Sequence, residues 1–163
     1  MIAPGDDPDR AIKTLEFNCR MGDPETQPIM MRVKSDLLDA LEHAVEGTLN
    51  QADIVWDRRT ALGVVLASHN YPNTPRTGDV IRGLPADAED CMVFHAATEL
   101  DGDDTKTTGG RVLCVTALGD SVKMARDRVY EAIDGIHFDG RQYRSDIGWR
   151  ALKPSQQKPK SHA

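Results

Sequence analysis

The chain has 163 residues, enough for one compact domain with a hydrophobic core, or for a small domain plus part of another. Its hydrophobic fraction of 39% and charged fraction of 28% are typical of a globular protein and exclude a disordered or fibrous one. The formal net charge is −6, and no dense lysine and arginine face is evident, so nucleic acid is not expected as a partner.

The sequence also gives no indication of a membrane span, a signal peptide or a disulfide framework. No apolar run approaches the roughly 20 residues that span a bilayer, so no membrane partner is expected. The N-terminus lacks the basic region and apolar core of a signal peptide. The three cysteines, Cys19, Cys91 and Cys114, are odd in number and far apart, which disfavours a disulfide scaffold or a zinc site. A cytoplasmic protein with small, buried cysteines is therefore expected.

The chain opens with two apolar stretches that flank a turn rich in proline, glycine and aspartate, residues 4–10. In residues 12–19 apolar and polar side chains alternate, which predicts a strand with one buried and one exposed side. Cys19 lies on the apolar side. The first arm of this hairpin has only three residues, too few for stable pairing, so the sequence favours a start inside a larger sheet.

A single helix is predicted after the proline-rich turn, ending near Glu46. Either Asp23 or Thr26 can cap it, and the sequence does not choose between them. Gly47 is a suitable C-terminal stop. One apolar face is expected, made of Met30, Val33, Leu37, Leu41 and Val45.

The second region, from about residue 60 to residue 152, contains most of the predicted strands. Short apolar runs predict strands at residues 61–68, 79–84, 91–100 and 109–118, and residues 99–110 are expected to form a polar hairpin tip or loop. The clearest helix covers residues 119–135, capped by Asp120 or Ser121. Its apolar face comprises Val122, Ala125, Val129, Ile133 and Ile136. The fold class is therefore α+β, with strands first and the helix late.

One polar cluster suggests chemistry. Glu16 and Asn18 would place two oxygen donors roughly 7 Å apart on one strand face, a spacing that suits Mg²⁺ with additional water and phosphate ligands. Arg20 could bind a phosphate or acyl phosphate, and the helix entry adds backbone N–H groups. These residue types indicate phosphoryl transfer. The alternative is a strand face that is polar only because it is solvated.

The same stretch carries a resemblance. Glu16-Phe17-Asn18-x-Arg20, followed by Gly22-Asp23-Pro24-Glu25, resembles the end of the ATP-grasp domain in the phosphoribosylamine–glycine ligase (glycinamide ribonucleotide synthetase) family. Met21 departs from the usual residue but stays apolar. The likeness continues in order through residues 34–38, 56–59, 64–68, 78–85, 93–98, 109–120 and 146–152.

The resemblance implies an enzyme of purine biosynthesis that ligates glycine to 5-phosphoribosylamine through a glycyl phosphate, with ATP as co-substrate. It implies that Glu16 and Asn18 bind Mg²⁺ (or Mn²⁺), that Arg20 contacts the phosphoryl oxygens, and that Asp23 and Glu25 help form the substrate pocket. Residues 1–58 would be a C-terminal remnant of the ATP-grasp domain, residues 59–152 the C-terminal α+β domain, and residues 153–163 a polar tail.

Family members are more than twice as long, so the N-terminal portion of the ligase is expected as a missing partner. A chain without the nucleotide-binding half is predicted to be inactive alone. A non-catalytic module that serves folding or assembly is an alternative, and another ATP-grasp carboxylate–amine ligase, such as the biotin carboxylase type, is a weaker one.

Several other residues have structural interpretations. His95 is expected to be a hydrogen-bonded core histidine and not a ligand. The loop at residues 69–73 replaces a glycine-rich family run, and Asn70 is expected to tolerate positive φ better than His69. Trp149 and Arg150 could stack within the closing segment, or lie near the substrate.

Overall fold

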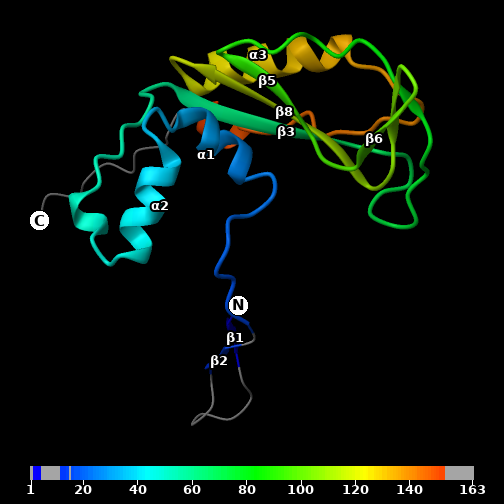
Figure 1. Cartoon of the computed structure of the whole chain (residues 1–163). Coiled ribbons are helices and arrows are strands. Elements are labelled where there is room, and N and C mark those ends of the chain that lie inside the picture. Colours follow the sequence, from blue (N-terminus) through cyan, green and yellow to red (C-terminus); the bar gives the residue numbers. More distant parts are fainter. Residues whose placement is uncertain (1, 5–11, 15, 153–163) are drawn as a thin grey trace, which may run out of the picture.

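A computed structural model describes residues 2–4, 12–14 and 16–152 (Figure 1). The chain starts with a two-stranded hairpin, β1 (Ile2–Pro4) and β2 (Ile12–Thr14), which extends away from the folded body. Two helices follow, and then the strands and the long helix of the second region. The expected mixture of helices and small antiparallel sheets is confirmed.

The central sheet has the order β3 (Thr60–Ala67), β8 (Arg111–Gly119), β5 (Cys91–His95), with both pairs antiparallel. Its two faces are covered by different helices (Figure 1). On β3 the side chains of Leu62, Val64 and Leu66 are buried on one face, which packs against the long helix. The opposite face carries Gly63, where an added Cβ would lie 3.1 Å from Pro28 of the first helix.

The long helix α3 (Val122–Gly135) confirms the sequence prediction. Ser121, and not the alternative Asp120, is its N-cap, and the Ser121 side chain accepts a hydrogen bond from the Met124 N–H at 3.2 Å. Of the expected apolar face, Val122 is partly buried against the core and the other four residues are fully buried: Ala125, Val129, Ile133 and Ile136. Cys114 is buried as expected, and Cys91 is half-buried.

A second sheet has the order β4 (Val80–Ile81), β7 (Asp104–Thr107), β6 (Thr98–Asp101). The single strand predicted at residues 91–100 is wrong, because the chain leaves β8 after Ala97 and pairs with β7 instead. The predicted polar tip is the β6–β7 hairpin. His95 is exposed, so its expected burial is wrong, although its Nδ1 lies 3.0 Å from the Thr98 hydroxyl.

The single helix predicted before Glu46 is also wrong. The structure has α1 (Thr26–Arg32) and α2 (Leu37–Val45), followed by a 3₁₀ turn, η2 (Leu49–Gln51). The break has a tertiary cause: the Lys34 N–H donates to the Val55 carbonyl at 2.9 Å, and the Asp57 N–H donates to the Arg32 carbonyl at 2.7 Å. These bonds hold the chain in an extended conformation between the helices.

The details of both helices differ accordingly. Neither Asp23 nor Thr26 caps α1, whose N-cap is Glu25 without a side-chain capping bond. Asp36 caps α2 by accepting from the Leu38 N–H. Of the predicted apolar face, Met30 and Val33 are half-buried, whereas Leu41 is 54% exposed and Val45 is 90% exposed.

The strand predicted over residues 12–19 ends at Thr14. Residues 16–22 have no strand partner among the described residues, which leaves Phe17 86% exposed and Cys19 exposed instead of buried. Alternation alone does not make a strand when no neighbouring strand accepts its backbone hydrogen bonds. The chain closes with a short helix, α4 (Trp149–Leu152).

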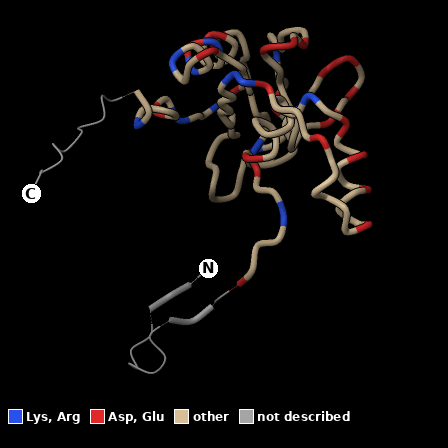
Figure 2. The backbone as a smooth tube through the Cα atoms, turned by 90° about the vertical axis from the view of Figure 1, so that its left-hand side faces the viewer, with Lys and Arg blue, Asp and Glu red and all other residues tan. Residues whose placement is uncertain are grey.

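The described residues contain no helix that is both long and apolar enough to cross a membrane. Over the same residues, positions of lysine and arginine alternate with positions of aspartate and glutamate along the backbone (Figure 2).

Candidate active site

The acidic motif forms a compact turn at the start of α1. The Glu25 carboxylate accepts a hydrogen bond from the Gly22 N–H at 2.8 Å, and the Thr26 hydroxyl donates to the Gly22 carbonyl at 2.7 Å. A Cβ at Gly22 would lie 2.8 Å from the Glu25 carboxylate oxygen, so a side chain there would displace this carboxylate from its hydrogen bond with the Gly22 N–H. Glu25 therefore determines the conformation of the turn itself.

Asp23 attaches this turn to the central sheet. Its Oδ2 lies 3.3 Å from Nη2 of Arg111, its backbone carbonyl accepts from Nη1 of Arg111 at 2.9 Å, and its Oδ1 accepts from the Gln27 side chain at 3.1 Å. Arg111 is the first residue of β8, and sequence reasoning missed it. The available signal was a single arginine between Gly109-Gly110 and an otherwise apolar strand.

The segment before the turn carries the predicted metal ligands. The side chains of Glu16, Asn18 and Arg20 are all exposed, and Arg20 Nη1 donates to the Met21 carbonyl at 3.1 Å. The structure therefore brings Asp23 and Glu25 together in one turn, which Arg111 of β8 contacts through Asp23. It does not place Glu16 and Asn18 on a strand face.

The donor chemistry of this segment suits a hard cation. No group of three His, Cys, Asp or Glu side chains that could hold a metal occurs in the described part of the chain. A Glu and Asn pair is a different kind of site, because Mg²⁺ takes one or two protein oxygens and completes its shell with water and phosphate. Glu16 and Asn18 have the oxygen atoms and the exposure for that arrangement.

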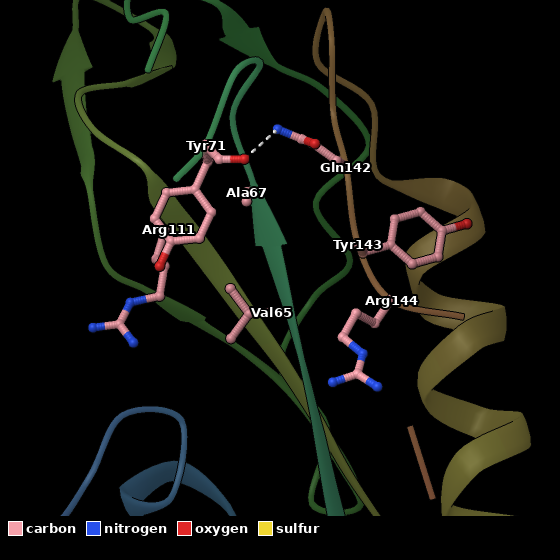
Figure 3. A pocket seen from close by; sticks show the side chains of 7 residues that line it. All are labelled: Val65, Ala67, Tyr71, Arg111, Gln142, Tyr143 and Arg144. Carbon is pink, nitrogen blue, oxygen red and sulfur yellow. Dashed lines mark hydrogen bonds between the residues drawn. The ribbon is translucent and has the colours of Figure 1, made fainter. Parts of the chain in front are cut away.

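A pocket of about 310 Å³ opens beside Arg111 (Figure 3). Val65 and Ala67 of β3 form part of its lining; in strand alternation they share the side of Gly63, the side that α1 covers. The full lining comprises Val65, Ala67, Tyr71, Arg111, Gln142, Tyr143 and Arg144. The pocket and the acidic turn therefore lie on the same face of the sheet and share Arg111.

The walls of this pocket are fixed by hydrogen bonds between distant segments. The Gln142 side-chain amide donates to the Ser68 carbonyl at 2.6 Å and to the Tyr71 carbonyl at 3.4 Å (Figure 3). The backbones of Ala67 and Gln142 exchange two hydrogen bonds, at 2.8 and 2.9 Å. Asn70 adopts φ 68°, the left-handed conformation that asparagine was expected to tolerate better than His69.

A second ion pair flanks the pocket. The Arg144 guanidinium donates to both carboxylate oxygens of Asp146, at 2.9 and 2.7 Å. These hydrogen bonds lower the pKa of the Asp146 carboxyl, so it stays ionised and keeps Arg144 in place. In the adjoining segment the Arg150 guanidinium lies over the Trp149 ring at 5.7 Å, as the stacking hypothesis expected.

The structure is thus an α+β domain preceded by an acidic turn, Gly22 to Glu25. Arg111 of the central sheet holds this turn in place through Asp23. Comparison with known proteins gives the family. The family described as "Phosphoribosylglycinamide synthetase, C domain" matches residues 61–150, more than half of the chain, and the chain therefore belongs to this family.

Individual curated relatives and a solved structure indicate the same family as the family model. The chain is 58% identical to the phosphoribosylamine–glycine ligase of Ralstonia nicotianae over 90% of its own length, and 54% identical to that of Escherichia coli O157:H7 over 88%. The crystal structure of the Thermotoga maritima phosphoribosylamine–glycine ligase matches with a TM-score of 0.70 and 34% identity, over 85% of this chain and 34% of that one. The chain spans about a third of the length of the curated relatives it matches: 35% and 34%.

Proposed function

We propose that this chain is the C-terminal part of an ATP-dependent ligase that joins glycine to 5-phosphoribosylamine through a glycyl phosphate. The observation that carries the proposal is the acidic turn, which is held against the sheet by Asp23 and Arg111 directly after the Glu16 to Arg20 segment. A turn fixed in this way presents the residues before it at a constant place beside the C-terminal domain.

The residues from Glu16 to Glu25 would have three different roles in this reaction. Glu16 and Asn18 would hold Mg²⁺ or Mn²⁺, which neutralises charge on the ATP phosphates when bound. Arg20, with its planar guanidinium, would hold the oxygens of the transferred phosphoryl group. Asp23 and Glu25 position this segment, since their carboxylates contact Arg111 and the Gly22 N–H.

We assign residues 1–58 to the end of an ATP-grasp domain, residues 59–152 to the C-terminal domain and residues 153–163 to a tail. The distribution of apolar side chains supports this division. An apolar surface on α2 and the segment after it would pack against the remaining, N-terminal part of the ligase. Its exposed members are Leu38, Leu41, Val45, Leu49, Ile54, Val55 and Trp56.

The test is reconstitution. The chain is co-expressed with the preceding two-thirds of the Ralstonia nicotianae ligase, and ADP formation that depends on glycine and phosphoribosylamine is measured. We expect activity from the pair and none from either part. The double variant Glu16→Ala, Asn18→Ala should lower the rate at least about a hundredfold, since a charge-stabilising group is lost.

The matched control removes the same residue types elsewhere. Glu99→Ala with Asn73→Ala changes two exposed side chains outside the turn and the pocket, and the rate should stay within about twofold. A pair that associates but shows no ligase activity would contradict the proposal and favour a non-catalytic module.

A further inference from the structure

Helix α1 is attached to the central sheet at both of its ends, and it packs against β3 and β8 between them (Figure 1). At the N-terminal end, Asp23 contacts Arg111, the first residue of β8, which pairs with Ala67 at the end of β3. At the C-terminal end, Arg32 is hydrogen-bonded to Asp57, just before the start of β3. The two attachments therefore lie near opposite ends of the same strand pair, and α1 runs along β3.

The middle of α1 lies unusually close to the sheet. An added Cβ at Gly63 of β3 would lie 3.1 Å from the Pro28 ring and 3.2 Å from the side chains of Cys114 and Thr116. These distances are shorter than ordinary contacts, so glycine permits this close approach of the helix. A short helix that is held at both ends and packed at its middle cannot tilt on the sheet, whereas one held at a single end can pivot there.

Asp57 forms the C-terminal attachment through both its backbone and its side chain. Its N–H donates to the Arg32 carbonyl at 2.7 Å, and its carbonyl accepts from Arg32 Nε and Nη2 at 3.2 and 3.0 Å. Its carboxylate accepts from Arg59 Nη2 at 2.6 Å and lies 3.4 Å from Lys34 Nζ. The Asp57 side chain is only 8% exposed, so water and salt screen these charge-assisted contacts less than they screen a surface ion pair.

Glu89, from the loop before β5, completes a cluster of two cations and two carboxylates. Its Oε1 lies 3.3 Å from Lys34 Nζ and 3.4 Å from Arg59 Nη2. The Glu89 side chain is 78% exposed, and exposed ion pairs contribute little to stability. Asp57 is therefore the member of the cluster that holds the end of α1.

We propose that Asp57 is a positioning residue for the ligase reaction, an inference that rests on the proposed function. By holding the C-terminal end of α1, Asp57 prevents the helix from pivoting about the contact between Asp23 and Arg111. The segment from Glu16 to Arg20 leads directly into the turn that precedes α1, so a pivot of the helix displaces this segment from the transferred phosphoryl group. In this role Asp57 acts through α1 and not through contact with a substrate.

The first test measures native-state amide exchange of α1 in the 163-residue chain. Asp57→Asn removes the charge and keeps the shape of the side chain, so the α1 amides should exchange about tenfold faster, while those of β8 stay within about twofold. The control Asp101→Asn makes the same change at an ion pair with Lys106 in the β6–β7 hairpin, and α1 exchange should stay within about twofold. Unchanged α1 exchange in Asp57→Asn would overturn the anchoring role.

The second test uses the reconstituted ligase, with the N-terminal part in saturating excess so that weaker association does not lower the rate. Asp57→Asn should lower kcat about tenfold and raise the Mg²⁺ concentration for half-maximal rate about fivefold, with the KM for phosphoribosylamine within about twofold. A merely structural role would lower the amount of folded pair and leave the Mg²⁺ requirement unchanged. Wild-type kcat and Mg²⁺ requirement in Asp57→Asn would overturn the proposal and leave the ligase function intact.

Lys34 supplies a second variant that does not threaten the fold, because its side chain is 42% exposed. Lys34→Gln removes one contact of the Asp57 carboxylate, so α1 exchange and the Mg²⁺ requirement should both rise about threefold, and the charge-retaining Lys34→Arg should stay within about twofold of wild type. If Asp57→Asn does not fold, a Lys34→Gln variant without either change overturns the proposal. An inactive wild-type pair would remove the ligase function, while α1 exchange in the chain alone still decides whether Asp57 holds the helix.

Discussion

The two regions of the molecule differ in where their apolar side chains lie. Among the described residues, Ala40 is the one buried apolar residue before residue 60, whereas the hydrophobic core lies between Leu62 and Phe138. Large apolar side chains on α2 and its neighbours are exposed instead. The second region thus folds around a core of its own, and the first leaves an apolar surface exposed. Similar hydrophobicity in a sequence does not imply similar stability.

The largest expected effect is in hydrogen exchange. Amides of β8 and α3 should exchange at least about a thousandfold more slowly than those of α2, because the former open only on global unfolding and the latter by local opening. Native-state exchange followed by NMR measures this contrast. Similar protection in α2 and α3 would show that the first region is part of the same cooperative unit, and the comparison would fail.

A pair of leucine substitutions probes the same contrast. Leu66 is fully buried in β3, so Leu66→Ala should lower the free energy of unfolding by about 3 kcal/mol. Leu41 in α2 is 54% exposed, and Leu41→Ala should change it by less than about 0.5 kcal/mol. Denaturant unfolding of the two variants gives both values. Equal losses would mean that Leu41 packs against something that supports the folded state.

The sequence predicted what depends on local pattern. Helix α3 follows from a 3.6-residue apolar period beginning after Ser121, and β3 and β8 follow from short apolar runs. The break between α1 and α2 depends on contacts with Val55 and Asp57, which no local pattern contains. Alternation in residues 12–19 predicted a strand, but a strand also needs a neighbour.

The candidate site was predictable to the same extent. The motif from Glu16 to Glu25 identified the residues of the turn, because residue types reveal chemistry directly. Arg111 contacts Asp23 from 88 positions away, and the Tyr71 and Arg144 walls of the pocket come from two further segments. Such long-range pairs are set by sheet register and loop conformation, which a single sequence does not specify.

The N-caps of α2 and α3 allow the stabilities of the two regions to be compared through the same type of hydrogen bond. Ser121 caps α3 and Asp36 caps α2, each through one hydrogen bond from a backbone N–H. Ser121→Ala should lower the free energy of unfolding by about 1 kcal/mol. Asp36→Ala should change it by a few tenths at most, because α2 is not part of the cooperative core. A loss of about 1 kcal/mol from both variants would indicate one folding unit.

The smallest expected effect concerns the junction of the two regions, and it depends on pH. Hydrogen bonds from Arg59, together with Lys34 at 3.4 Å, hold the pKa of the Asp57 carboxyl well below its ordinary 3.8. A lowered pKa means that this stabilisation is complete above about pH 4 and is lost as the pH falls toward the folded-state pKa. Asp57→Asn should therefore weaken protection of the Lys34 amide at pH 7, and the difference from wild type should shrink below pH 4.

Asp53→Asn, at an exposed position, provides the matched control and should leave that protection unchanged. A deficit in Asp57→Asn that stays constant down to pH 2 would show that the junction depends on the backbone bonds of Asp57 with Arg32, and not on its carboxylate. In that case this contact between the two regions would depend on hydrogen bonds to the backbone of Asp57 and not on the charge of its side chain.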